Sequence, residues 1–277
     1  HVMRRPETKN VSVGCGHRNA RAEFAFQSKQ LDRSMIDAAR LAPFFRKLEL
    51  RDHVSAEERA ALLGCVSEEM FYAAGADLVS EGERPATSIL VVEGFTIRYS
   101  DSPGGSRQIT AIHVPGDFVD LHSFLLKEMD HSVGALSNCR CLRFPHARLK
   151  VLSEEHPHLL RLLWLTTLID GSIHRAWLIA AGRTAPEQIA HLVCELYVRL
   201  GASGLVSGDS FVLPLTQVEL GEALGLSAVH VNRSLQQLRS EGLFVWQNQT
   251  IRILDWPMLQ RRASFDPRYL HLVKEPR

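Results

Sequence analysis

The sequence predicts an α+β protein with three parts in order: an N-terminal β-roll, a long helix and a C-terminal winged helix-turn-helix. Three observations predict it, namely short strand-like runs between turn residues, a long apolar stripe at helical spacing, and two short helical patterns followed by a hairpin pattern. The expected divisions are a flexible arm over 1–35, the roll over 36–152, the helix over 153–182, the winged domain over 183–265 and a tail over 266–277.

Four strand-like runs mark the roll. They are rich in β-branched and other apolar residues, and glycine, proline and aspartate between them favour turns. The runs cover residues 76–83, 88–99, 107–113 and 133–144. Regularly spaced short strands are typical of an antiparallel, barrel-like sheet. Ahead of them, residues from about Asp37 to Ala74 are expected to be helical.

A stripe of residues at alternating steps of three and four begins at Leu159 and is typical of a coiled-coil seam. One helix cannot bury such a seam alone, so the stripe predicts a contact between two copies of the chain. The alternative is that it packs on the roll of its own chain. The predicted seam consists of Leu159, Leu162, Thr166, Ile169, Ile173, Ala176 and Ala180.

Two short helices are predicted on either side of Gly225. Thr216 is a favourable N-cap, and Glu219 stands three residues later, where it completes a capping box. Gly225 suits a sharp turn because glycine adopts positive φ without steric cost. Ser227 can cap a second helix over 227–240, which is amphipathic and carries hydrogen-bonding groups on its outer face.

The segment after these helices reads as a β-hairpin, because apolar runs at 243–245 and 251–254 flank Gln247-Asn248-Gln249. Helix, turn, helix and hairpin together make a winged helix, which reads duplex DNA. The planar fork of Arg233 suits the two acceptors of a guanine edge. A winged module that contacts proteins is the alternative. The predicted DNA-contacting residues are Thr216, Gln217, Ser227, Val229, His230, Asn232, Arg233 and Gln249.

Taken in this order, the three parts resemble the Crp/Fnr superfamily of transcription regulators over roughly Leu41 to Pro257. The resemblance implies a cyclic-nucleotide-binding-like roll under effector control and a homodimer joined through the long helix. It also implies sequence-specific binding to a palindromic promoter site on double-stranded DNA in the bacterial cytoplasm. RNA polymerase is a further candidate partner, and no enzymatic activity is expected.

The recognition helix departs from the best-known pattern of this family. The catabolite-activator type presents arginine, glutamate and arginine to the bases, and the matching positions here are Ala228, Val229 and Arg233. Only the last is retained. The target sequence is therefore expected to differ, with Val229 able to pack on a thymine methyl group.

Cyclic-nucleotide pockets of the family use a Gly-Glu pair for the ribose and an Arg-Ser pair for the phosphate. Here Gly116-Asp117 and His131-Ser132 hold those positions, so the arginine is missing. A histidine lacks the bidentate fork and full charge, and cyclic AMP is not the expected effector. These four residues are the candidate pocket for an unidentified effector; alternatively, Gly116-Asp117 is only a turn of the roll.

An iron-sulfur sensor needs four clustered thiolates. The region before the roll contains only Cys15 and Cys65, so that mechanism is not expected. Cys139 and Cys141 alternate along one strand and share a face. That arrangement fits either a thiol sensor or two small buried apolar groups.

Four histidines are haem or metal candidates by residue type only, and the sequence predicts no metal site and no identified cofactor. A metal enzyme built on the roll would need a His-x-His pair with a following glutamate, and these histidines lack that spacing. The remaining alternative function is a roll that binds a metal or nucleotide, with a winged domain used for protein contacts. The four histidines are His113, His122, His131 and His174.

The composition of the chain limits these functional interpretations. The 277 residues carry a formal net charge of +1, so attraction to nucleic acid has to come from a local patch. Five cysteines without a framework spacing fit a reducing compartment, and no apolar run is long enough to span a membrane. The chain is therefore expected to be cytoplasmic.

Overall fold

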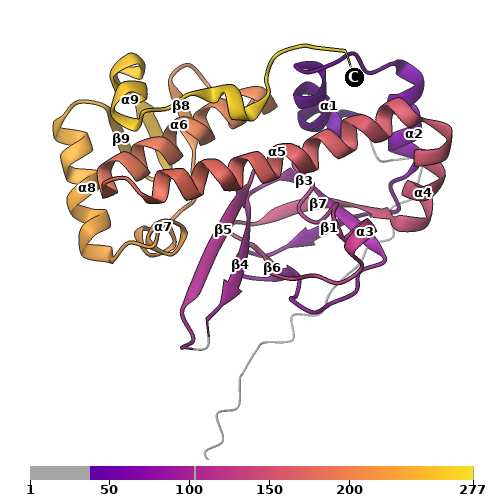
Figure 1. The fold of residues 1–277 in the computed structure, drawn as a ribbon, viewed down its shortest axis with the longest axis horizontal. Coiled ribbons are helices and arrows are strands. Elements are labelled where there is room, and N and C mark those ends of the chain that lie inside the picture. Colours follow the sequence, from indigo (N-terminus) through magenta and orange to yellow (C-terminus); the bar gives the residue numbers. More distant parts are fainter. Residues whose placement is uncertain (1–37, 103, 277) are drawn as a thin grey trace, which may run out of the picture.

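The computed structural model describes residues 38–102 and 104–276. The arm expected over 1–35, with Cys15, lies outside the described residues. Helix α5 (Pro157–Ala181) runs along the molecule and joins the roll to the C-terminal domain (Figure 1). Among the described helices, none combines the length and the apolar character that crossing a lipid bilayer needs.

The leading segment is helical over a shorter range than expected. A 3-10 turn at Ala38–Leu41 leads into α1 (Ala42–Glu49), and α2 (Ala56–Gly64) follows behind a Ser55 capping box. The chain then forms strand β1 (Glu68–Tyr72), which corrects the helical expectation through Ala74. In β1 the buried Met70 and Tyr72 flank an exposed Phe71, which is the alternation of a half-buried strand.

The roll consists of two antiparallel sheets, as expected. Their strand orders are β1-β7-β3 and β2-β6-β4-β5. A one-turn helix α3 (Ser123–Leu126) lies between β5 and β6. The remaining strands are β2 (Asp77–Val79), β3 (Thr87–Glu93), β4 (Thr96–Asp101), β5 (Arg107–His113), β6 (Ser132–Ala135) and β7 (Cys139–Pro145).

The long helix starts later than predicted. Residues 146–155 form a separate helix α4 (His146–Glu155), and α5 begins at Pro157, so the predicted start at residue 153 is wrong. Proline at the first position of α5 has no amide to donate, and it restricts His156 to a non-helical conformation, which ends α4.

The predicted seam on α5 faces the chain's own core. Leu159 and Leu162 pack in the apolar cluster that joins α5 to α1 and α2, while Ile169 and Ile173 pack in the cluster shared with the C-terminal domain. Ala180 is also buried, whereas Thr166 and Ala176 are half-buried. Five of the seven predicted seam residues are therefore buried within their own chain, as the alternative interpretation expects. The helix is apolar on both sides, so its periodicity did not reveal which side meets the roll.

The C-terminal domain is a winged helix with one more strand than predicted. Its three-stranded sheet has the order β8-β10-β9 and shares one apolar cluster with four helices of the domain. Strand β8 precedes the helix-turn-helix and is only three residues long. It is too short to be recognised from a sequence pattern. The elements are α6 (Ala185–Ser203), β8 (Ser210–Val212), α7 (Gln217–Leu224), α8 (Ala228–Ser240), β9 (Phe244–Gln247), β10 (Thr250–Ile253) and α9 (Trp256–Ala263).

The described part of the tail returns to the start of the roll. A 3-10 turn (Pro267–Leu270) buries Leu270, and the Arg51 guanidinium donates to the carbonyls of Leu270 and His271, each at 3.1 Å. Figure 1 shows the tail reaching α1 from the far side of the molecule. These hydrogen bonds therefore connect the C-terminal tail to the segment that follows α1.

Candidate nucleic-acid interface

The helix-turn-helix forms through local chemistry that the sequence predicts. The Thr216 hydroxyl accepts from the Glu219 amide at 3.2 Å, and the Glu219 carboxylate accepts from the Thr216 amide at 2.8 Å, which confirms the capping box. Gly225 ends α7 with a φ of 65°. Gly221 is a further requirement that was not predicted: a Cβ there would lie 2.6 Å from the Leu226 carbonyl oxygen. The only indication of this requirement in the sequence was that a glycine stands inside a predicted helix.

Helix α8 presents a polar outer face. Ser227 caps it, its hydroxyl accepting from the His230 amide at 3.4 Å. Val231 and Leu238 are fully buried on the inner side, whereas Val229 is 76% exposed. The exposed residues of α8 are Ala228, Val229, His230, Asn232, Arg233, Gln236, Gln237, Arg239 and Ser240.

A groove of about 460 Å³ lies between the helix-turn-helix and the wing. It brings together four of the predicted residues, Thr216, Gln217, Asn232 and Gln249, and the Asn232 amide donates to the Gln217 side chain at 3.4 Å. The other four, Ser227, Val229, His230 and Arg233, are exposed on α8 or at its start outside this groove. The groove is also lined by Gln236, Arg239 and Gln247, which were not among the predicted DNA-contacting residues.

The wing turns through Asn248 and Gln249, whose φ angles of 48° and 60° are left-handed. Two successive left-handed residues make the turn that matches strand twist in a hairpin, and asparagine tolerates this conformation. The turn places Gln249 at the edge of the groove. Arg233 forms no ion pair with any described residue, so its guanidinium is available to a partner.

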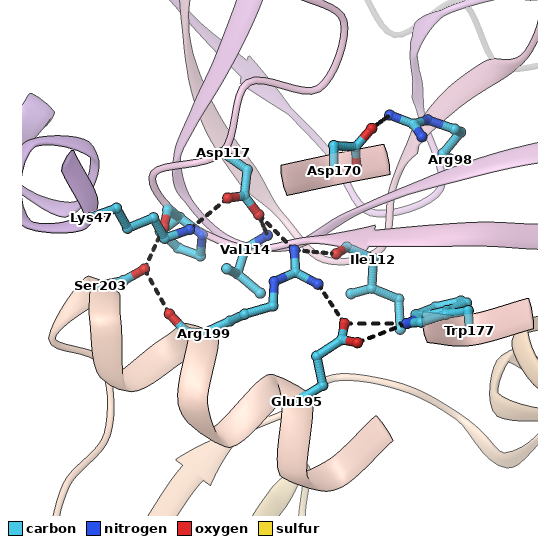
Figure 2. Close-up of polar contacts among 11 residues, drawn as sticks. Lys47, Arg98, Ile112, Val114, Asp117, Asp170, Trp177, Glu195, Arg199 and Ser203 are labelled. Carbon is cyan, nitrogen blue, oxygen red and sulfur yellow. Dashed lines mark hydrogen bonds and ion pairs between the residues drawn. The ribbon is translucent and has the colours of Figure 1, made fainter. Parts of the chain in front are cut away.

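Asp117 forms ion pairs with residues from two other parts of the chain. Lys47 of α1 lies 2.6 Å from one carboxylate oxygen and Arg199 of α6 lies 2.8 Å from the other, which also accepts from the Val114 amide (Figure 2). Burial would raise the pKa of Asp117, but Lys47 and Arg199 hold it well below its usual range. This carboxylate is therefore engaged within the chain.

Arg199 extends this contact across the domain boundary. Its guanidinium also bonds the Glu195 carboxylate at 3.0 Å and the Ile112 carbonyl at 2.8 Å, and Glu195 accepts from the Trp177 indole (Figure 2). We call Lys47, Asp117, Arg199 and Glu195 the buried charge layer. It connects α1, the roll and α6. No sequence pattern marks it because its members are far apart along the chain.

Gly116 supports the same junction from the backbone. Its φ is 86°, and a Cβ there would come within 2.8 Å of the Pro43 carbonyl at the start of α1. Gly116 and Asp117 thus form a turn of the roll that packs on neighbouring helices, which favours the turn interpretation over a ribose site.

His131 and Ser132 lie elsewhere, so the structure does not bring the four candidate effector residues into one pocket. The Ser132 hydroxyl accepts from the Glu81 amide at 3.0 Å. His131 lines a cavity of about 440 Å³ between the roll and α5. An arginine does face this cavity: Arg98 of β4, paired with Asp170 of α5 at 2.7 Å. Nothing in the sequence singled out Arg98, which is one residue within a predicted strand.

The cysteines of the roll are buried core groups. Cys139 and Cys141 are both inaccessible to solvent, and burial raises the pKa of each thiol. Raised pKa and burial oppose reaction with oxidants, because the thiolate is the reactive form. Of the two interpretations of this pair, the structure favours the small buried apolar groups. The remaining described cysteines, Cys65 and Cys194, are buried as well.

Comparison with known proteins finds two matching families and a set of regulators. The Crp-like helix-turn-helix domain matches residues 187–262, and the cyclic nucleotide-binding domain matches residues 69–156. The transcriptional activator protein FnrA of Stutzerimonas stutzeri is 29% identical over 182 residues, which are 65% of this chain and 74% of the relative. The nitrogen fixation regulation protein FixK of Bradyrhizobium diazoefficiens is 27% identical over 199 residues, 70% of this chain and 81% of the relative.

Among solved structures, FixK2 from Bradyrhizobium japonicum has the same fold, with a TM-score of 0.65 and 24% identity, covering 72% of this chain and 98% of that chain. The two family matches fall on the roll and on the winged domain, on either side of α5. With the capped helix-turn-helix and its wing, they establish the relationship that the sequence suggested. The chain belongs to the Crp/Fnr superfamily of DNA-binding transcription regulators.

Proposed function

We propose that this regulator acts as a homodimer on a palindromic DNA site, with one α8 helix in each of two successive major grooves. The observation that carries the proposal is the exposed polar face of α8, with Arg233 in no ion pair among the described residues. A two-fold dimer places two such helices about one helical turn apart, roughly 34 Å, on one side of the duplex.

The proposed contacts follow from position and chemistry. Arg233 reads a guanine edge, Asn232 and His230 supply further polar contacts, and Val229 packs on a thymine methyl group. A second set contacts phosphates from helix N-termini and the wing, where backbone amides favour anions. That set consists of Thr216, Gln217, Ser227 and Gln249.

The second copy docks on the free side of α5, opposite the seam expected from the sequence. This side carries large apolar side chains at helical spacing, and Trp164 is 63% exposed. Contiguous exposed apolar side chains mark interaction sites. Pairing two such helices removes the apolar side chains of both from water. The exposed residues of the stripe are Leu160, Trp164, Leu168, Leu178 and Ile179.

Control by a signal in the roll is part of this proposal. The buried charge layer ties the roll to α6, and Arg107 of β5 lies 2.7 Å from Glu222 of α7. A change in the roll therefore has a physical route to the helix-turn-helix. The engaged Asp117 and the absence of an arginine at position 131 support an effector other than cyclic AMP. RNA polymerase is a proposed further partner, and we expect no catalysis from a regulator of this family.

Selection from a random DNA pool tests the proposal. We expect the wild type to enrich a site with two-fold symmetry and half-sites one helical turn apart. Trp164→Glu places a charge in the α5 stripe, and we expect a monomer in sedimentation that binds the selected site at least tenfold more weakly. Val151→Glu, also exposed but on α4, is the matched control. Enrichment of no symmetric site, or a wild-type monomer on DNA, would reject the proposal.

A further inference from the structure

Three potential metal ligands converge at the edge of the cavity between the roll and α5. They are His122, just before α3, and the consecutive Asp130 and His131, just before β6. One ligand atom from each lies within 4.8 Å of the other two. The two imidazole rings are 5.0 Å apart between centroids. Among the described residues, this is the group of histidine, cysteine and carboxylate side chains placed to share one ion.

The hydrogen bonding leaves nitrogen lone pairs unused. Nδ1 of His131 lies 2.5 Å from the Asp130 carboxylate. A carboxylate only accepts, so Nδ1 carries the proton and Nε2 carries a lone pair. Nε2 of His131 and Nε2 of His122 are both buried and have no hydrogen-bond partner among the described residues. Buried polar atoms are usually hydrogen-bonded, and these two neighbouring nitrogens are both available to bind one ligand.

The Asp130 carboxylate supports one of these two ligands. The contact of His131 with Asp130 is the carboxylate–histidine pairing that orients metal-binding histidines and makes them more basic.

The surroundings also allow a cation. Arg98 faces the same cavity, but its charge is compensated by Asp170 at 2.7 Å. Asp130 then leaves the immediate site with a net negative charge. The cavity has room for water at the remaining coordination positions.

We propose that His122 and His131 bind one divalent first-row transition metal ion through imidazole nitrogens, with Asp130 orienting His131 through its Nδ1. Imidazole ligands favour Zn²⁺, Co²⁺ or Ni²⁺ over Mg²⁺ and Ca²⁺, which prefer oxygen ligands. The ion would lie against α5, because Thr167, Asp170 and Gly171 form the opposite wall of the cavity. This site is separate from the DNA-contacting surface and does not depend on how that surface acts.

The test is a Co²⁺ titration of the full-length protein after dialysis against a chelator, followed by visible absorption. We expect one equivalent to bind with a micromolar or lower dissociation constant, Zn²⁺ to displace it, and millimolar Mg²⁺ to have no effect. His122→Gln and His131→Gln should each weaken binding at least tenfold. His53→Gln removes an exposed histidine outside the cluster and should change nothing.

Asp130→Asn keeps the test informative if a histidine variant does not fold. The Asp130 side chain is 78% exposed, so the substitution should leave the fold intact while weakening Co²⁺ binding. Thermal unfolding of each variant without metal checks the fold. Binding weaker than millimolar, or binding that is unchanged in His122→Gln, His131→Gln and Asp130→Asn, would overturn the proposal.

Discussion

Charged residues are used in opposite ways at the domain junction and on the recognition helix. At the junction, the four members of the buried charge layer are nearly inaccessible or half-buried, and each is bonded to another member. On α8, Arg233 and Arg239 are exposed and form no ion pair within the described chain. Partners for the first group come from the same chain, and partners for the second have to come from outside.

The difference separates residues that hold the domains from residues that recognise a target. Desolvating a charge is costly unless it is paired, so removing one member of a buried network is strongly destabilising. An exposed charge contributes little to folding and is free to contribute to binding. Stability and DNA affinity should therefore respond to different arginines.

Arg199→Ala should have the largest effect on stability. It leaves Asp117 and Glu195 buried without their common partner, and we expect a loss of about 3 to 5 kcal/mol in the free energy of unfolding. Urea denaturation measures it. Arg239→Ala, which removes an exposed arginine, should change stability by less than about 0.5 kcal/mol. Equal effects from the two substitutions would remove the distinction between the regions.

Asp120 shows what burial does to a carboxylate that forms no ion pair with a described residue. It lies three residues from Asp117 and is fully buried; one oxygen accepts from the Ile89 amide at 2.6 Å. Burial raises its pKa from 3.8 to about 7. A raised native pKa means that the native state binds the proton more tightly than the unfolded state, so stability falls as pH rises from about 4 to 7.

Asp120→Asn should remove this pH dependence while keeping an oxygen for the Ile89 amide. Relative to the variant, the wild type should lose up to a few kcal/mol of stability between pH 4 and pH 7, measured by urea denaturation across that range. Parallel stability curves for the two proteins would show that Asp120 does not titrate in this interval.

Arg233→Ala should act on DNA and not on folding. We expect a loss of about 1 to 3 kcal/mol in affinity for the selected site, with discrimination relaxed at one base pair. Fluorescence anisotropy on the selected and a scrambled duplex measures it. Arg268→Ala removes the same charge from a side chain that is 90% exposed and lies outside α8, and it should have little effect. An equal loss on both duplexes would assign Arg233 to phosphate contacts.

The sequence was most informative where structure depends on neighbouring residues. The Thr216–Glu219 capping box, the left-handed Gly225 and the Ser227 cap act over three or four residues, and all are present in the structure. Strands β2 to β7 overlap the four predicted runs, because alternation and turn residues are local, but β1 was expected to be helical. These features sufficed for the fold class and for the candidate DNA-contacting face.

Features that join distant segments were not predictable. Asp117 meets partners 70 and 82 residues away, so the sequence could not reveal its ion pairs, and the family resemblance suggested a ribose contact instead. The α5 stripe packs largely within its own chain, and its period alone did not decide this because a helical period does not identify the packing partner of an element with two apolar sides. The convergence of His122 with His131 depends on the path of the chain through α3, which no spacing rule describes.

Arg107→Ala should have the smallest effect, although Arg107 also joins the two domains. Its guanidinium bonds Glu222 of α7 at 2.7 Å, but both side chains are partly exposed, so water and salt screen the pair. We expect a loss of less than about 1 kcal/mol in stability, measured by thermal unfolding at low salt, and a smaller one at high salt.

Glu222→Gln should show the same small loss and the same salt response, and the double variant should be no worse than either single one. A loss as large as that of Arg199→Ala would mean that the exposed pair, rather than the buried charge layer, holds α7 on the roll. Because salt weakens only the screened contact, the salt dependence of domain docking distinguishes the two. If docking is held by Arg199, it should persist at ionic strengths that abolish the contribution of Arg107.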